Sequence, residues 1–178
     1  MMSRCPECWL STDDGAISGE SDLRCEACCE AASGGTRVHH APLERGDLEL
    51  ILAWRSHPDV YDHFRQQEGP LDWENHVTWF ESRSGDRYDF MIHYAGRRVG
   101  VVSLNVDDQI SIYIGDHSAR EHGVATKSLQ WLCRRFRDRE PLIAEIHENN
   151  YSSRQLFERC NFERKERDGE WLIYAYKS

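Results

Sequence analysis

The 178-residue chain contains no long hydrophobic run, and no stretch approaches the roughly 20 apolar residues that a membrane-spanning helix needs. The first residues, MMSRCPEC, also lack the apolar stretch of a secretory signal peptide. We therefore expect a soluble, cytoplasmic protein that does not use a membrane. Because two full-sized domains would need a longer chain, the length predicts one well-buried domain with a small appendage.

Lysine is scarce: only Lys127, Lys165 and Lys177 occur among 22 basic residues, against 31 acidic residues. The formal net charge is −9 at pH 7. A protein that binds nucleic acid over its whole surface normally needs a basic face to displace counterions. The charge therefore argues against nucleic acid as a partner, and only a local basic patch remains open.

Cysteine is rare in most of the chain, because five of the seven cysteines lie near the N-terminus. Cys5 and Cys8 form one Cys-x-x-Cys pair, and Cys25 and Cys28 form a second one after sixteen intervening residues. Two such pairs supply the four thiolates of a tetrahedral Zn²⁺ site, so we predict a structural zinc ribbon over residues 1–30. The alternatives are a disulfide, disfavoured without an export signal, and a redox dithiol, which needs no second pair.

Residues 31–36 are small and indicate a flexible linker, so the main domain is expected over residues 37–178. Residues 1–35 contain two arginines against seven acidic residues, which is unfavourable for nucleic acid. A protein partner or a dimer cap suits this ribbon better. Both a monomer and a homodimer remain open.

Hydrophobic periodicity in the main domain predicts a layered arrangement of helices and strands. Alternation with period two predicts three antiparallel strands at residues 88–94, 99–104 and 110–114. A helix after residue 123 then leads to a strand at 141–147, which as a crossover should lie parallel to the strand at 110–114. The other expected elements are strands at 37–43, 162–166 and 171–176 and helices at 47–55, 71–80 and 150–160. The sequence therefore predicts an α/β (α+β) domain with a mixed, largely antiparallel sheet of six to seven strands and helices on both faces.

The stretch from Arg120 to Ala125 joins the strand at 110–114 to the following helix. A glycine turn with a helix beginning beneath it directs several unpaired backbone N–H groups at one point, which suits a phosphate. An ordinary strand-to-helix loop is the alternative at this point of the argument.

Together with the order of the elements, this loop resembles the acyl-CoA loop of GNAT-superfamily N-acetyltransferases, whose form Arg/Gln-x-x-Gly-x-Gly/Ala is met by Arg120, Gly123 and Ala125. Asn150 and Ser153 resemble the downstream residues of that family. The resemblance covers the whole main domain. It implies a GNAT fold and the transfer of an acetyl group from acetyl-CoA to an amine by direct attack.

The resemblance also implies where acetyl-CoA binds. Its pyrophosphate would lie on the loop, and its pantetheine would pair with the strand backbone near Ile114, where the strands ending at Ile114 and His147 splay apart. The residues assigned to acetyl-CoA on this basis are Ile112, Tyr113, Ile114, Arg120, Glu121, His122, Gly123, Val124, Ala125, Asn150, Ser153 and Phe157.

Four residues are candidates for proton transfer. Family members carry Tyr where this chain has Phe157, and that tyrosine often protonates the leaving thiolate; Tyr151, Tyr113 or water would replace it, or the thiolate would leave unprotonated. Glu145 is the first choice for the base that deprotonates the amine, since ribosomal-protein alanine acetyltransferases carry their catalytic Glu there. His147 lies on the same side of its strand and is the second choice, with a surface histidine of no catalytic role as the alternative.

The N-terminal half of the domain carries a narrower resemblance, through the segments WRSHPDV and ENHVTWF. These are similar to segments of nucleotide-sugar N-acetyltransferases of the pseudaminic-acid pathway and, more loosely, of ribosomal-protein acetyltransferases. A nucleotide-linked amino sugar would use Arg55 against phosphate, Phe64 against sugar or base, and His76 as a hydrogen-bonding group. The alternatives are a helix-end salt bridge for Arg55 and core packing for Phe64 and His76.

Two other functions remain open from the sequence. One is acetylation of a protein N-terminus or a ribosomal protein. The other is a catalytically weak module that binds CoA while its zinc ribbon docks a protein partner.

Overall fold

The computed structural model describes residues 28, 31, 37–139 and 141–177. Of the expected zinc ligands only Cys28 falls in this range, and Cys5, Cys8 and Cys25 lie outside the described residues. The strands are β1 (Val38–Pro42), β2 (Tyr88–Tyr94), β3 (Arg97–Leu104), β4 (Ile110–Ile114), β5 (Ile143–His147), β6 (Phe162–Asp168) and β7 (Trp171–Tyr176). The α-helices are α2 (Leu48–Arg55), α3 (Pro58–Tyr61), α4 (Trp73–Glu81), α5 (Val124–Arg135) and α6 (Tyr151–Arg159). Three 3₁₀ turns are η1 (Arg45–Asp47), η2 (His117–Ala119) and η3 (Arg137–Arg139).

The seven strands form two sheets, whereas we expected one mixed sheet. One has the order β1-β2-β3-β4 and the other the order β5-β7-β6, and every strand pair within them is antiparallel. The expected parallel alignment of β4 with β5 is reduced to one bridge, between Gln109 and Ile143. Both residues lie at the start of their strands, so the two strands touch there and then diverge. The prediction of a largely antiparallel α+β domain is confirmed, and its single sheet is corrected to two.

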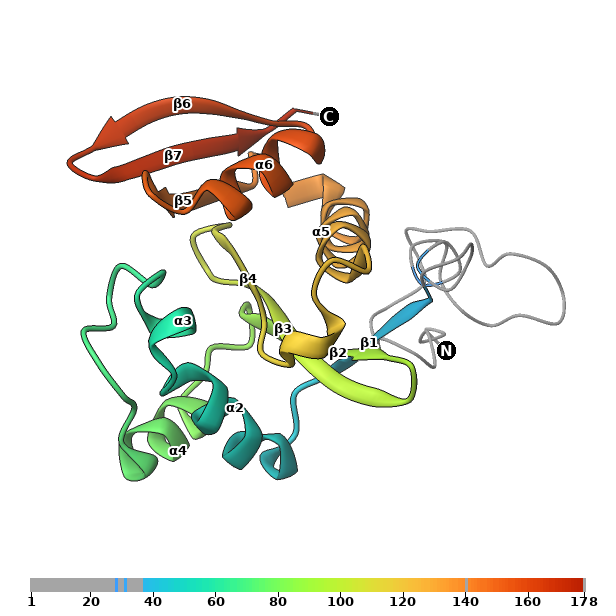
Figure 1. Cartoon of the computed structure of the whole chain (residues 1–178), viewed down its shortest axis with the longest axis vertical. Coiled ribbons are helices and arrows are strands. Elements are labelled where there is room, and N and C mark those ends of the chain that lie inside the picture. The colour runs from blue at the N-terminus through green and yellow to red at the C-terminus, as the bar shows by residue number, and fades with distance from the viewer. Residues whose placement is uncertain (1–27, 29–30, 32–36, 140, 178) are drawn as a thin grey trace, which may run out of the picture.

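The helices cover both faces of the larger sheet (Figure 1). The strand β2 contributes side chains to both faces, because successive side chains of a strand point to opposite faces of the sheet. Phe90 and Ile92 join the main core, which α5 closes, while Met91 packs with Ile51 of α2 and Val101 of β3 in a second cluster. In Figure 1 the β5–β7 sheet and α6 form the upper part, helices α2 to α4 form the lower left, and β4 lies between them.

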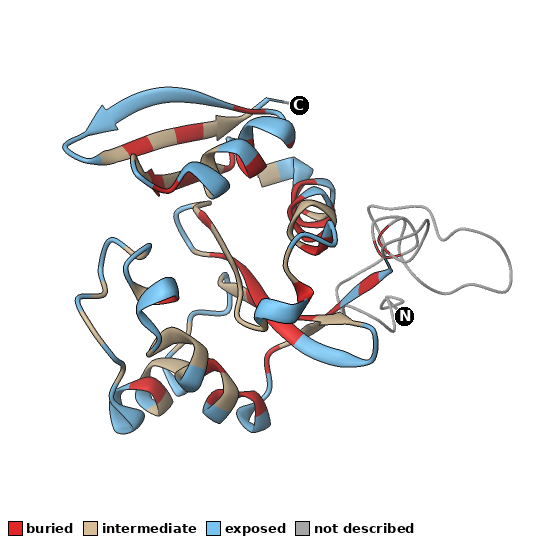
Figure 2. Cartoon of the chain, in the orientation of Figure 1, coloured by how far each residue is buried: buried red, intermediate tan, exposed pale blue. Residues whose placement is uncertain are grey.

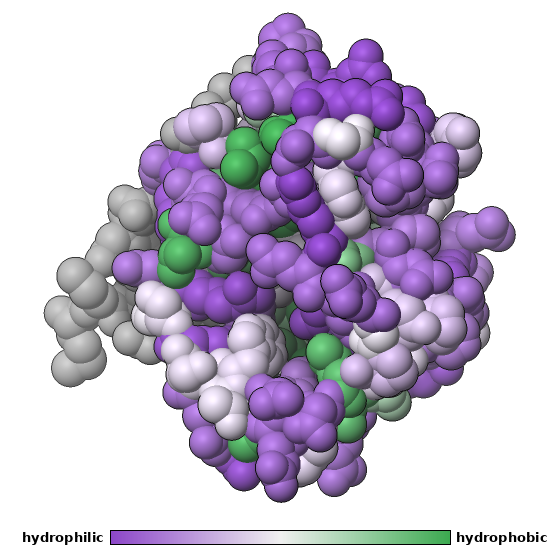
Figure 3. All heavy atoms as spheres, turned by 90° about the vertical axis from the view of Figure 1, so that its left-hand side faces the viewer, coloured by the Kyte–Doolittle hydropathy of each residue, from purple (hydrophilic) through white to green (hydrophobic). Residues whose placement is uncertain are grey.

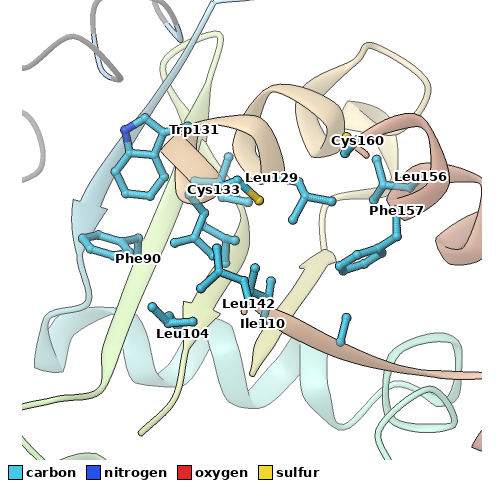
Figure 4. Close-up of a cluster of buried hydrophobic side chains, with 14 of the residues drawn as sticks. Phe90, Leu104, Ile110, Leu129, Trp131, Cys133, Leu142, Leu156, Phe157 and Cys160 are labelled. Atoms are coloured by element: carbon cyan, nitrogen blue, oxygen red, sulfur yellow. The ribbon is translucent and has the colours of Figure 1, made fainter. Parts of the chain in front are cut away.

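The main core lies between the larger sheet, α5 and α6, and its side chains interlock across these elements (Figure 4). The indole of Trp131 meets the ring of Phe90 edge-on at 4.8 Å between centroids. It also stacks on the ring of His40 at 4.0 Å. The Nε2 of His40 lies 2.9 Å from the hydroxyl of Ser128, and burial lowers the pKa of His40 to about 3, so this ring packs in its neutral form.

The side chain of Cys28 belongs to this same core. It is 2% exposed, and the indole N–H of Trp131 donates a hydrogen bond to its sulfur at 3.2 Å. Ala31, expected at the start of the flexible linker, is 3% exposed in the same cluster. These two residues therefore contact the main domain directly.

Burial is concentrated in the centre of the larger sheet and on one side of α5, whereas β6 is exposed along almost its whole length (Figure 2). In α5 the buried residues include Leu129, Leu132 and Cys133, which lie at helical spacing and form one apolar stripe. Among the helices that the structure describes, none combines the length and apolar character needed to cross a lipid bilayer.

Substitution of Gly100 in β3 is expected to destabilise the fold, because a Cβ atom there would lie 2.3 Å from the carbonyl oxygen of Tyr113 in β4. That oxygen belongs to backbone, so the strand itself must move. We expect Gly100→Ala to lower the free energy of unfolding by about 1–3 kcal/mol, measured by urea denaturation. Gly85→Ala is the matched control, since a Cβ atom at residue 85 meets nothing within 4 Å. Equal stability of the two variants would contradict this close contact.

Candidate functional site

A cavity of about 1220 Å³ opens where β4 and β5 diverge. Its walls are residues of α2, α3, α4 and β4 on one side and of the loop before α5, β5 and α6 on the other. Pockets for one small ligand reach about 1,000 Å³, so this cavity is larger than a usual single-ligand pocket. The face of the molecule shown in Figure 3 is hollowed between its upper and lower parts and is mostly hydrophilic.

The loop before α5 has the backbone geometry expected for an anion seat. Glu121 and Gly123 both have left-handed backbones, with φ of 64° and 76°, and α5 begins directly after them at Val124. The free N–H groups of the first helical turn therefore face the loop, at the positive end of the helix dipole. The guanidinium of Arg120 does not point away into solvent, because its Nε and Nη2 donate to the carbonyl of Ile114 at 3.3 and 3.2 Å. The loop is thereby fastened to the end of β4.

The outer edge of β4 is available for a ligand. One edge of β4 pairs with β3, from Gly100 opposite Ile114 to Leu104 opposite Ile110. On the other edge the only backbone pairing with a described strand is the Gln109–Ile143 bridge, just before the first residue of β4. An extended molecule in the cavity can therefore hydrogen-bond to β4 as an additional strand.

The structure brings most residues assigned to acetyl-CoA to this cavity. Their roles stay predictions. His122 is the exception, since its ring stacks against Tyr94 at 5.9 Å and lies outside the lining. The assigned residues that line the cavity are Ile112, Tyr113, Ile114, Arg120, Glu121, Gly123, Val124, Ala125, Asn150, Ser153 and Phe157.

Asn150 has a structural task of its own at the start of α6. Its side-chain oxygen accepts hydrogen bonds from the backbone N–H of Ser153 at 3.2 Å and from the hydroxyl of Ser152 at 3.1 Å, which makes it the N-cap. Phe157, two turns later, is 3% exposed and packs edge-on against Phe162. Tyr151 is 66% exposed and lies outside the lining, so Tyr113 and water are better placed than Tyr151 to protonate a thiolate in the cavity.

The two candidate bases have different surroundings although both lie on β5. Glu145 lines the cavity, and its Oε1 accepts a hydrogen bond from Arg65 at 3.2 Å. The ring of His147 lies outside the lining; it meets Trp171 edge-on at 5.2 Å, and its Nδ1 accepts the backbone N–H of Asn149 at 3.2 Å. The structure thus places the carboxylate, and not the imidazole, on the cavity wall.

Arg55, assigned to the acceptor, ends α2 on the cavity wall with its guanidinium held in a fixed orientation. Its Nε and Nη2 donate to the side-chain oxygen of Gln67 at 3.1 and 2.8 Å, and its Cζ lies 4.6 Å from the centre of the Phe64 ring. Within the described residues no carboxylate lies at ion-pair distance from this guanidinium, so the expected alternative of a helix-end salt bridge is not formed there. Burial lowers the pKa of Arg55 from its usual value, which indicates that solvent has little access to this guanidinium.

Two buried polar atoms near Arg55, unlike its guanidinium, have no hydrogen-bond partner in the described structure. One is Nε2 of His76, whose ring is 3% exposed and stacks parallel to Trp79 at 5.5 Å. The other is the hydroxyl of Tyr113, and burial raises the pKa of that tyrosine. An unsatisfied buried polar atom costs about 1–3 kcal/mol, so both atoms would gain from a polar ligand or water in the cavity.

Sequence reasoning missed a buried charge cluster at the base of this wall. The carboxylate of Asp89, with a side chain only 1% exposed, accepts hydrogen bonds from Arg87 at 2.9 to 3.1 Å and from Arg83 at 3.0 Å. Asp89 is a charged residue inside an apolar strand, a signal that pointed to a buried partner without identifying it. The arginines stand in the loop after α4, six and two residues before Asp89, so the charge pattern over residues 83–89 was the signal that could have found the cluster.

Comparison with known proteins agrees with this geometry. Residues 37–163 match the family described as acetyltransferase (GNAT) domain. Uncharacterized protein MJ1062 of Methanocaldococcus jannaschii is 35% identical over 160 residues, which cover 81% of this chain and 32% of that protein. The chain thus spans about a third of the length of this relative.

Solved structures show the same fold. A domain from Methanocaldococcus jannaschii is 30% identical and superimposes with a TM-score of 0.73, over 79% of this chain and 98% of that domain. Spermidine N-acetyltransferase from Vibrio cholerae, in complex with CoA and spermine, is 14% identical with a TM-score of 0.65, over 78% of this chain and 92% of that one. From the match over residues 37–163, the chain belongs to the GNAT acetyltransferase family and carries its N-acetyltransferase domain.

Proposed function

We propose that the protein transfers the acetyl group of acetyl-CoA to a primary amine of a small, anionic acceptor, such as a nucleotide-linked amino sugar. The observation that carries the choice of acceptor is Arg55, a half-buried guanidinium on the cavity wall without a carboxylate partner in the described structure. A planar guanidinium held by Gln67 and Phe64 suits bidentate binding of a phosphate.

The donor half of the cavity supports acetyl-CoA. The loop at Glu121–Gly123 and the first turn of α5 suit its pyrophosphate, and the outer edge of β4 suits its pantetheine. CoA is a ligand in the structure of the Vibrio cholerae spermidine N-acetyltransferase, which has the same fold. The thioester would then lie near Ile114, and the acceptor would enter from the side of α2 to α4.

In this arrangement Glu145 acts as the base, directly or through water, because it is the candidate that lines the cavity. Its hydrogen bond with Arg65 holds the carboxylate in place. The amine, once deprotonated, attacks the thioester carbonyl, and a backbone N–H near Ile114 stabilises the oxyanion. The CoA thiolate then leaves with a proton from Tyr113 or water, or unprotonated.

We further propose that Cys5, Cys8, Cys25 and Cys28 bind structural Zn²⁺. The spacing carries this proposal, and the N–H of Trp131 directed at the sulfur of Cys28 is consistent with a thiolate ligand there. We also propose that the protein acts in the cytoplasm and that this segment binds a protein partner.

A second candidate function is a CoA-binding module without efficient catalysis. The observation in its favour is Phe157, which has no proton to give where the family carries Tyr. Release of free thiol from acetyl-CoA upon addition of any amine would exclude it.

For the donor site, Gly123→Asp is expected to weaken acetyl-CoA binding at least tenfold, because the new carboxylate lies at the seat of the pyrophosphate and repels it. Asp tolerates a left-handed backbone better than most residues, so the fold should survive. Gly96→Asp is the matched control, since its φ of 74° equals that of Gly123 within 2° and it lies outside the cavity. Isothermal titration with acetyl-CoA measures the difference, and equal affinities would refute the assignment of the loop.

For the acceptor, anionic amines such as UDP-linked amino sugars should release thiol faster than polyamines or peptides at equal concentration. Arg55→Gln should raise KM for the anionic acceptor about 10- to 100-fold with a smaller change in kcat, since a charge-assisted hydrogen bond is worth about 1.5–3 kcal/mol. Arg45→Gln, whose arginine pairs with Glu81 outside the cavity, is the control. Preference for a polycation, unchanged by Arg55→Gln, would be incompatible with this acceptor class.

For the base, Glu145→Gln is expected to lower kcat by about 10²-fold or more at neutral pH, because the amide cannot accept a proton. His147→Gln should leave kcat within about twofold, since that ring lies outside the cavity. Steady-state thiol release with saturating acetyl-CoA and acceptor measures both variants. If His147→Gln is the slower enzyme, the roles must be exchanged.

A further inference from the structure

We propose that His57, Asp59 and His117 form a binding site for a transition-metal ion of the zinc type at the rim of the cavity. One potential ligand atom from each residue lies within 4.8 Å of the other two. The Oδ2 of Asp59 is 3.8 Å from Nδ1 of His57 and 3.9 Å from Nε2 of His117, so the carboxylate stands between the two imidazoles.

His57 and Asp59 are neighbours in the sequence, but His117 comes from a distant part of the chain, so the meeting of all three side chains does not follow from sequence proximity alone. His57 is the N-cap of α3, and Asp59 lies in the first turn of that helix. His117 belongs to η2, which follows β4. Their side chains are about half exposed, and modest rotations about χ angles would bring the ligand atoms to the separations of a metal site.

The electrostatic environment of Asp59 favours a cation. Two other surface carboxylates, Asp116 and Asp168, pair with Arg97 and Arg65. Among the described residues, the basic side chains within 4 Å of the Asp59 carboxylate are the two histidines and no arginine or lysine. The Nδ1 of His57 accepts the backbone N–H of Asp59 at 3.2 Å, so this nitrogen carries the lone pair that a metal ion would take over.

The donor set defines the kind of metal. Two imidazole nitrogens and one carboxylate oxygen suit Zn²⁺, Co²⁺ or Ni²⁺, whereas Mg²⁺ and Ca²⁺ prefer oxygen ligands only. Three protein ligands leave a coordination position open for water or for a group of a bound molecule. Asp59 and His117 both line the cavity, so the open position can face its mouth.

The position of the site gives such a metal a mechanical effect. α3 belongs to the acceptor wall, and η2 connects β4 to the loop that ends at Gly123. A metal bound to both would fasten the acceptor wall to the strand end beside the donor site. The site is independent of the cysteines, and the proposal does not require the proposed acetyl transfer.

The test is equilibrium dialysis of tag-free, full-length protein, stripped of metal with a chelator, against Zn²⁺ alone. His117→Gln should bind one equivalent of zinc less than the wild type, and Asp59→Asn should bind the same equivalent at least tenfold more weakly. His63→Gln is the matched control, because His63 is an exposed histidine on the same rim outside the cluster. Zinc bound by cysteine is common to all four proteins and cancels in the comparison.

A second measurement keeps the result independent of folding defects. Without zinc, the variants should unfold at the temperature of the wild type, and zinc should raise the unfolding temperature less in His117→Gln than in His63→Gln. Equal zinc stoichiometry and affinity in wild type and His117→Gln would overturn the proposal. Because no acetyl-CoA or amine is present, failure here leaves the proposed transferase activity untouched.

Discussion

The divergence of β4 and β5 is the constraint on which the rest of this structure depends. The two strands touch at one bridge, Gln109 with Ile143, and from there the backbone groups along the outer edge of β4 have no neighbouring strand in the described structure. Unpaired backbone groups in a partly apolar cleft are costly, and a ligand with amide groups relieves that cost. The same divergence separates the sheet that carries α5 from the sheet that carries Glu145. One topological feature thus opens the cavity, leaves a strand edge without a neighbouring strand on one side and places Glu145 on the other.

The cavity wall formed by α2 to α4 holds arginines with different kinds of partner. Asp89 forms ion pairs with both Arg83 and Arg87. Arg55 is oriented by neutral partners, an amide oxygen and an aromatic ring, and keeps its full charge for the cavity. The difference between the arginines lies in their partners, and it makes one guanidinium structural and another available for binding.

The order of the elements could be predicted from the sequence because period-two and helical patterns are local, and β2, β3, β4 and α5 formed where those patterns indicated. The split into two sheets could not be predicted from the sequence. The number of backbone pairings between β4 and β5 depends on how α5 and α6 pack between the two sheets. For the site, the loop at Gly123 was visible as a motif with local backbone requirements. Asp89 lies within six residues of Arg83 and Arg87, so a local signal for that cluster existed, whereas the cluster around Asp59 needs His117 from a distant segment.

The packing of Cys28 against Trp131 shifts the physical boundary of the domain. The family match begins at residue 37, but the indole at the centre of the core already has a sulfur atom from residue 28 as its hydrogen-bond acceptor. Cys28 and Ala31 fill space beside α5 that would otherwise be apolar surface open to water. A protein trimmed to the family match would therefore expose part of its own interior. Cys28 and Ala31 are, in this sense, part of the cover of α5, so the packed domain extends beyond the family match on its N-terminal side.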